Sequence, residues 1–71
     1  MYFGVNMKRL RESLDMTQAQ LAETVGVARS MICRIETGTK VASLMLAKQI
    51  ADALGCTLDK LFETPAPEEA R

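Results

Sequence analysis

The stretch of the 71-residue chain that is most informative about chemistry runs from Thr17 to Gly38, TQAQLAETVGVARSMICRIETG. Its hydroxyl, amide and guanidinium groups donate and accept hydrogen bonds. The whole chain lacks His, which is the commonest general base and the commonest protein metal ligand. No nucleophile with a nearby base and no glycine-rich phosphate loop accompanies these groups. The residue types therefore favour binding over catalysis, and we do not expect an enzyme.

The two cysteines, Cys33 and Cys56, do not form a metal-binding pattern. A zinc site needs about four ligands, and neither cysteine belongs to a CxxC pair, so neither a metal nor another cofactor is expected. The chain also lacks a charged start followed by an apolar signal region, which favours a reducing, cytoplasmic compartment. No segment approaches the ~20 apolar residues of a membrane span, so no membrane partner is expected.

The spacing of small residues between Thr17 and Gly38 predicts two short helices joined by a tight turn. Thr17 and Gln20 have the spacing of a capping box, which starts the first helix. Gly26 accepts the positive φ that a sharp turn needs, and Ala22 is small enough to let the second helix cross close over the first. The turn holds the second helix away from the body, and such a helix fits the major groove of B-DNA.

Short apolar patterns of helical period alternate with capping residues and glycines along the chain, and they predict five helices. These are expected over 7–14 after an Asn6 cap, 18–25, about 29–37, 44–54 after a Ser43 cap, and in a short segment containing Leu58, Leu61 and Phe62 after a Thr57 cap. Asp15 is expected where the first helix ends in the left-handed region. The core is expected to be aliphatic, and on the fourth helix it includes Leu44, Ala47, Ile50, Ala51 and Leu54.

The two ends of the chain are expected to differ from this helical domain, which is placed at residues 6–63. Residues 1–5 are interpreted as an N-terminal extension, either an extended piece that pairs in β fashion with the chain around 62–64 or a frayed end. Residues 64–71 are proline-containing and acidic and are expected to be a disordered tail.

The pattern resembles the XRE-type helix-turn-helix regulators, also called lambda-repressor-like or Cro-type domains. The similarity runs in one register, without a gap, from about Met7 to Phe62. It covers Leu10-Arg11, Met16-Thr17-Gln18, Leu21-Ala22, Gly26-Val27, Ile32, Ile35-Glu36, Gly38, Ser43-Leu44, Ile50-Ala51, Ala53-Leu54-Gly55, Leu58 and Leu61-Phe62. The resemblance implies an all-α, five-helix fold whose second and third helices form the DNA-binding unit.

The resemblance also implies particular DNA contacts on double-stranded DNA. The third helix would be the recognition helix, and an arginine there can donate two hydrogen bonds to guanine O6 and N7. Its base-contacting residues would be Arg29, Ser30, Cys33 and Arg34. Phosphate contacts would come from Thr17 and Gln18, at the positive end of the second helix, and from Thr39 and Lys40 behind the recognition helix. For Gln18, a role in helix capping alone is the alternative.

Two further residues match a structural feature of the family, and other positions depart from the family pattern. Arg11 and Glu36 match a pair that in the family forms a salt bridge between the first and third helices, so both are assigned to structure. Ala28 stands where a Ser or Thr cap is usual. Leu14 stands where a polar residue is usual, so it is either exposed or covered by something outside the family pattern.

The formal net charge of zero conceals a basic and an acidic half. Residues 1–42 contain six basic and four acidic residues, and residues 43–71 contain three basic and five acidic residues. This modest bias predicts weak non-specific DNA binding with a shallow salt dependence.

Size predicts a homodimer, because one recognition helix buries only about 600–1,000 Å² of protein surface on DNA. A two-fold dimer doubles the contacts and reads a palindrome. The interface is expected on the fourth and fifth helices, with exposed Leu14 as the rival surface. Its residues would be Leu46, Leu58, Leu61 and Phe62.

The sequence therefore predicts a small homodimeric transcriptional regulator, most readily a repressor, that reads a palindromic operator. No small-molecule ligand is expected. The alternative is a protein-interaction module on the same fold, such as an antitoxin or a phage accessory protein.

Overall fold

A computed structural model of the chain describes residues 2–64. It contains five α-helices: α1 (Phe3–Ser13), α2 (Gln18–Val25), α3 (Arg29–Thr37), α4 (Leu44–Leu54) and α5 (Leu58–Phe62). The predicted all-α, five-helix architecture is confirmed. None of these helices has the length and apolar character needed to span a bilayer. Of the tail expected over 64–71, all but Thr64 lies outside the described residues.

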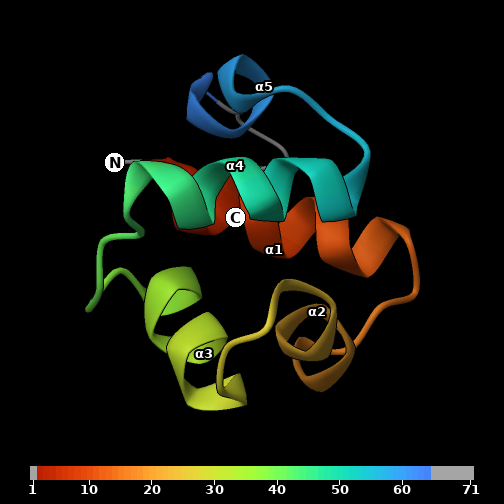
Figure 1. The fold of residues 1–71 in the computed structure, drawn as a ribbon. Coiled ribbons are helices and arrows are strands. Elements are labelled where there is room, and N and C mark those ends of the chain that lie inside the picture. The colour runs from red at the N-terminus through yellow and green to blue at the C-terminus, as the bar shows by residue number, and fades with distance from the viewer. Residues whose placement is uncertain (1, 65–71) are drawn as a thin grey trace.

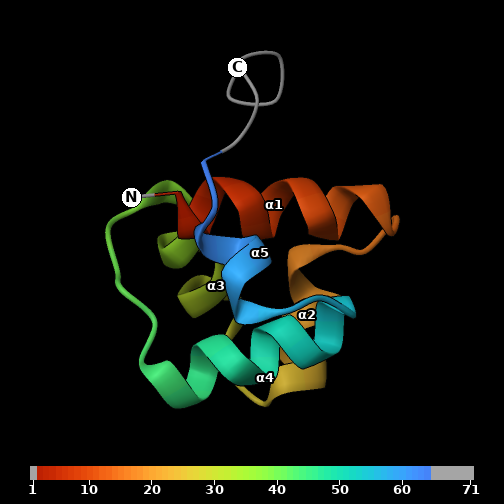
Figure 2. The same cartoon turned by 90° about the horizontal axis from the view of Figure 1, so that it is seen from above.

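The helices form two sides with a layer between them. In Figure 1, α2 and α3 lie on one side of the molecule and α5 lies on the other, with α1 and α4 between. The view from above in Figure 2 agrees, since α5 stands in front of α2 and α3. The predicted helix-turn-helix is therefore on the side opposite α5.

The N-terminal end differs from its prediction. Helix α1 begins at Phe3, so an Asn6 cap, an extended or frayed segment over 3–5 and its β pairing are wrong. Phe3 is buried and packs against Phe62 with ring centroids 5.2 Å apart, and burying an aromatic ring outweighs the missing side-chain cap at Tyr2. Asn6 is buried inside the helix, where its Nδ2 donates to the carbonyl oxygens of Leu61 (2.7 Å) and Glu63 (2.8 Å).

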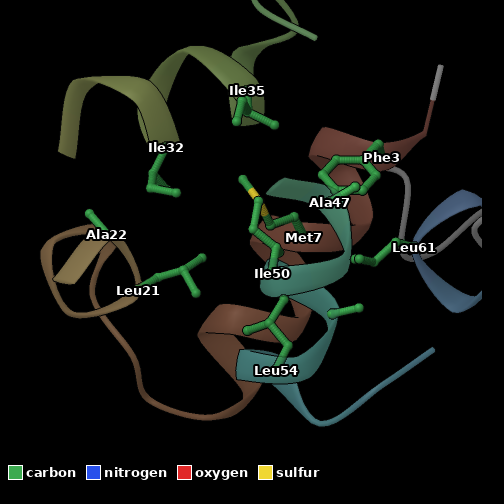
Figure 3. Packing of buried hydrophobic residues seen from close by; sticks show 11 residues of the cluster. Phe3, Met7, Leu21, Ala22, Ile32, Ile35, Ala47, Ile50, Leu54 and Leu61 are labelled. Carbon is green, nitrogen blue, oxygen red and sulfur yellow. The ribbon is translucent and has the colours of Figure 1, made fainter. Parts of the chain in front are cut away.

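The core is aliphatic apart from Phe3, and all five helices contribute to it (Figure 3). Two residues are placed wrongly by the sequence predictions, Leu44 in the core and Leu61 in the dimer interface. Leu44 is exposed, because the first residue of α4 extends past the edge of the core. Leu61 is fully buried, so it cannot take part in a dimer interface. The core residues are Phe3, Met7, Leu21, Ala22, Ile32, Ile35, Ala47, Ile50, Ala51, Leu54 and Leu61.

Local signals place the other helix ends correctly. The Thr17–Gln20 capping box is present in both directions, and Ser43 and Thr57 cap α4 and α5. Asp15 has a φ of 55°, which confirms the predicted left-handed position after α1. Leu14, next to it, is exposed.

Gly4 allows α1 and α3 to approach closely. A Cβ atom at this position would collide with the carbonyl oxygen of Ile35 and would lie 2.9 Å from the carbonyl oxygen of Glu36. Both are backbone atoms, which cannot move aside as a flexible side chain can. The contact was not foreseen from the sequence, and it fixes the distance between α1 and the C-terminal half of α3.

Gly4→Ala is therefore expected to lower the free energy of unfolding by about 1–3 kcal/mol, as overpacking typically does. The measurement is urea unfolding followed by circular dichroism. Val5→Ala, at the neighbouring partly exposed position, is the matched control and should change little. Equal stability of the Gly4→Ala variant and the wild type would contradict this close packing.

Candidate nucleic-acid interface

The turn between α2 and α3 is fixed by backbone hydrogen bonds. Gly26 has a φ of 77°, and the amides of Gly26 and Val27 both donate to the carbonyl oxygen of Ala22, at 2.8 and 3.0 Å. Ala22 itself is buried, and Ile32 of α3 turns toward it in Figure 3. A small residue at the crossing and a left-handed glycine at the turn thus hold α3 across α2, as the sequence predicts.

The outer face of α3 carries exposed polar side chains, and three of them are predicted base-contacting residues. Arg29, Ser30 and Arg34 are exposed, while Ile32 and Ile35 on the inner face are buried. Cys33 is half-buried at the edge of the outer face. Ala28 precedes the helix without a side-chain cap, and its carbonyl oxygen accepts a hydrogen bond from the Met31 amide at 3.0 Å.

A buried ion pair joins α1 to α3. Arg11 Nε donates to Glu36 Oε2 at 2.7 Å and Arg11 Nη2 donates to Glu36 Oε1 at 3.2 Å, so the pair is bidentate. Both side chains are buried, with exposed fractions of 9% and 2%. Arg11 Nη1 also donates to the carbonyl oxygen of Met16 at 2.6 Å, which fixes the loop before α2.

The hydrogen bond to Glu36 raises the pKa of the Arg11 guanidinium above its usual value, although burial acts in the opposite direction. Arg11 is therefore charged at neutral pH. The salt bridge implied by the family resemblance is present in this structure.

Gln18 extends this ion pair to the start of α3. Its Nε2 donates to Glu36 Oε1 at 2.9 Å, and its Oε1 accepts a long hydrogen bond of 3.4 Å from Arg29 Nη1. A chain of polar contacts thus runs from Arg11 through Glu36 and Gln18 to Arg29. The Gln18–Glu36 contact could not be predicted, because no short-range pattern links an amide at position 18 to a carboxylate at position 36.

The N-terminus of α2 offers two free backbone donors. The capping box satisfies the amides of Thr17 and Gln20, whereas the amides of Gln18 and Ala19 are among those that no turn of the helix can satisfy. Thr17 and Gln20 therefore cap α2. The side chain of Gln18 hydrogen-bonds to Glu36 and Arg29 instead, so a capping role alone does not explain its contacts. A shallow hollow lies at this helix end, and its lining includes Thr17, Gln18, Ala19, Arg29, Glu12 and Asp15.

The segment after α3 folds back onto the helix end. The amides of Thr39 and Lys40 donate to the carbonyl oxygen of Arg34 at 2.9 and 3.2 Å, and the Thr39 hydroxyl donates to the same oxygen at 3.2 Å. Gly38, with a φ of 85°, allows this reversal. The exposed side chain of Lys40 therefore starts from a fixed backbone, beyond the C-terminal end of α3.

The family to which this architecture belongs follows from comparison with known proteins. The family model described as Helix-turn-helix matches residues 7–61, most of the chain and all of α2 and α3. The chain belongs to the XRE-type helix-turn-helix family. The matched segment includes Arg11 and Glu36 and every residue that the resemblance assigns to DNA contact.

Relatives of this helix-turn-helix chain come from both bacteria and archaea. The uncharacterized HTH-type transcriptional regulator YgzD of Bacillus subtilis (strain 168) is 39% identical over 56 residues, covering 79% of this chain and 85% of that protein. The control protein C.MunI of Mycoplasma sp. is 36% identical over 61 residues, covering 84% of this chain and 82% of that protein. Antitoxin PezA of Streptococcus pneumoniae serotype 4 is 42% identical over 43 residues, which are 27% of that protein.

Arg11→Met is expected to lower the free energy of unfolding of this helix-turn-helix domain by about 3–5 kcal/mol, because it leaves the Glu36 carboxylate buried without its charged partner. Thermal and urea unfolding measure the loss. The double variant Arg11→Met, Glu36→Leu should recover part of the stability, since it removes both charges.

Lys48→Met is the matched control for the loss of a charge. Lys48 Nζ lies 3.9 Å from Asp52 Oδ2, and both side chains are exposed. This pair should therefore contribute less than about 1 kcal/mol to the free energy of unfolding. If the Arg11 and Lys48 variants lost similar amounts of unfolding free energy, a larger contribution of the buried pair to stability would be contradicted.

Proposed function

We propose that this chain is a sequence-specific transcriptional regulator that binds double-stranded DNA as a homodimer, reads a palindromic operator in the major groove and acts as a repressor. The observation that carries the proposal is the outer face of α3. It presents Arg29, Ser30 and Arg34 to solvent on a helix that the α2 crossing and the buried Arg11–Glu36 pair hold in place. Family membership and the names of the relatives support the same function.

In this proposal the residues of α3 contact base edges. Arg29 and Ser30 lie in its first turn, which enters the groove most deeply in helix-turn-helix proteins, and Arg34 follows one turn later. Cys33 contributes a small contact from the edge of the face. Gln18 accepts from Arg29 and is itself held by Glu36, so it limits the directions that the Arg29 guanidinium takes.

Phosphate groups would be bound on both sides of α3. The free amides of Gln18 and Ala19 and the positive end of the α2 dipole favour an anion at the N-terminus of α2, beside the Thr17 hydroxyl. On the other side, Thr39 and Lys40 follow α3 and reach the DNA backbone. Repression needs only that the bound site overlaps a promoter, since the bound protein then excludes the polymerase.

Two copies are proposed because α3 has nine residues and exposes few base-reading side chains. A single module of this kind buries about 600–1,000 Å² of protein surface on DNA. Pairing two modules by a two-fold axis doubles the contacts and requires a palindrome with half-sites about one helical turn apart.

Arg29→Ala is expected to weaken specific DNA binding by about 1–3 kcal/mol per half-site and to relax the preference at one base position. The operator is first selected from a random DNA pool with the wild-type protein, and both proteins are then titrated against it and against single-base variants. Thermal stability should not change, because the side chain is exposed. Undiminished binding of the selected operator by the variant would refute the assignment of α3 as the recognition helix.

Lys40→Ala is expected to weaken binding to all sequences alike, because a phosphate contact carries no sequence information. The slope of log K against log salt concentration should become shallower by about 1 per protomer. Lys48→Ala, on α4, is the matched control with no expected change of slope. A changed base preference in the Lys40→Ala variant would contradict the phosphate assignment.

A protein-interaction module is the second candidate, favoured by the likeness to antitoxin PezA. A gel shift with the selected DNA at two salt concentrations distinguishes the two. Binding that weakens with salt supports the DNA-binding regulator, whereas no selectable DNA, or a salt-insensitive complex, supports a protein partner.

A further inference from the structure

A small apolar recess lies between the start of α1, the end of α3 and the loop that leads to α4. Phe3 and Ile35, both buried in the core, form two of its walls, and Val41 and Ala42 of the loop form two others. All four side chains are hydrocarbon, so a water molecule in the recess finds few hydrogen-bonding partners among them. We refer to the hollow that these residues line as the loop recess.

Two glycines keep the loop recess open. Gly4 and Gly38 also line it, and neither has a side chain that would fill it. A Cβ atom at Gly38 would meet no atom beyond its chain neighbours within 4 Å, so the space beside this residue is free. The volume of the recess is about 110 Å³. Because an apolar cavity of about 150 Å³ holds a benzene ring, the loop recess has room for a chain of about four or five carbons.

Lys40 supplies the charge at the loop recess. It is the one charged residue among those that line the hollow, and its side chain is exposed. The lysine ion pairs within residues 2–64 involve Lys48 and Lys60, so the Lys40 ammonium has no carboxylate partner in that part of the chain. Hydrocarbon walls beside one unpaired cation are complementary to a molecule with a hydrocarbon chain and one anionic group.

We propose that the loop recess binds a short-chain aliphatic monocarboxylate. The hydrocarbon chain lies against Phe3, Ile35 and Ala42, and the carboxylate pairs with the Lys40 ammonium. An amine is disfavoured, because it would bring a second positive charge to Lys40 and would find no acidic residue in the lining. The proposal departs from the expectation that no small-molecule ligand binds, since a hollow between segments distant in sequence leaves no local pattern.

The position of the loop recess gives the bound carboxylate a regulatory effect, and this step rests on the proposed function. Lys40 is proposed there to contact a DNA phosphate from beyond the end of α3. A carboxylate on the same ammonium neutralises its charge and competes with the phosphate. Arg29 and Ser30, in the first turn of α3, are outside the recess lining. The ligand therefore weakens binding to all DNA sequences alike and acts as an inducer.

The first test is direct titration of the full chain with hexanoate in a calorimeter, without DNA. One molecule should bind per chain. The affinity should rise about fourfold for each methylene group from butanoate to hexanoate, the gain expected when one CH₂ group is buried, and should level off at octanoate because the recess is then full. Acetate, which has the charge without the chain, and 1-pentanol, which has the chain without the charge, should both bind more weakly.

Three variants, each checked for folding by circular dichroism, test the walls and the charge. Ala42→Leu fills the loop recess and should abolish saturable hexanoate binding, and Val41→Gln, at an exposed position, should weaken it. Lys40→Met should weaken hexanoate binding about two- to fivefold, the range of an exposed ion pair, and leave 1-pentanol binding unchanged. Ala53→Leu and Lys48→Met, on α4 and outside the recess lining, are matched controls that should bind hexanoate as the wild type does.

The second test adds hexanoate to the protein with the selected operator, against the same concentration of acetate so that the ionic strength is equal. The affinity of the wild type for DNA should fall toward that of the Lys40→Ala variant. The Lys40→Ala and Ala42→Leu variants should not respond to hexanoate, the first because the competing ammonium is gone and the second because the recess is filled.

The proposal is overturned if hexanoate does not bind saturably, if acetate binds as tightly, or if the Ala42→Leu or Lys40→Met variant binds hexanoate as the wild type does. A hexanoate affinity that falls as the protein concentration rises would mean that a second copy covers the recess, and this also overturns it. Unchanged operator affinity at saturating hexanoate overturns the regulatory effect. If the wild type binds no DNA, the proposed function fails, and the titration without DNA alone decides whether the site exists.

Discussion

The bidentate ion pair between Arg11 and Glu36 is the interaction on which the position of α3 depends. It lies where α1, α2 and α3 meet, and it holds the C-terminal half of α3 against α1 while its guanidinium also fixes the loop before α2 through Met16. A pair this well buried carries a large desolvation cost, which its several hydrogen bonds offset. Gln18 uses the same carboxylate, so the start of α3 is coupled to the same point as its end.

Helix α1 is the element that connects the two sides of the molecule. Gly4 permits its close approach to α3, and Asn6, two residues later, donates to carbonyl oxygens at the end of α5. Burial of Phe3 between these contacts makes the helix begin earlier than its capping signals suggest. Ser30 and Arg34 on the outer face of α3 are exposed and lie outside the core, while the start of α4 forms a separate apolar edge.

Features that depend on near neighbours could be predicted from the sequence. The bounds of α2, α3 and α4 follow from a capping box, a serine cap and glycines that accept positive φ, and each of these acts within one turn of the chain. The exposed face of α3 follows from helical period, since its buried isoleucines lie on the opposite side. Leu44 and Leu61 could not be assigned in the same way. Periodicity gives the direction of a side chain but not where the core ends along a helix.

The sequence by itself determined the family, the number of helices and the exposed polar face of α3, because these depend on local spacing and on side-chain chemistry. Only the tertiary structure decided that α1 starts at Phe3, that Gln18 joins the buried ion pair, and that Val41, Leu44 and Met45 form an exposed edge while Leu61 is covered. The physical reason is that these features arise between segments distant in sequence. Aromatic burial, close backbone approach and shared hydrogen bonds form only once the helices are packed.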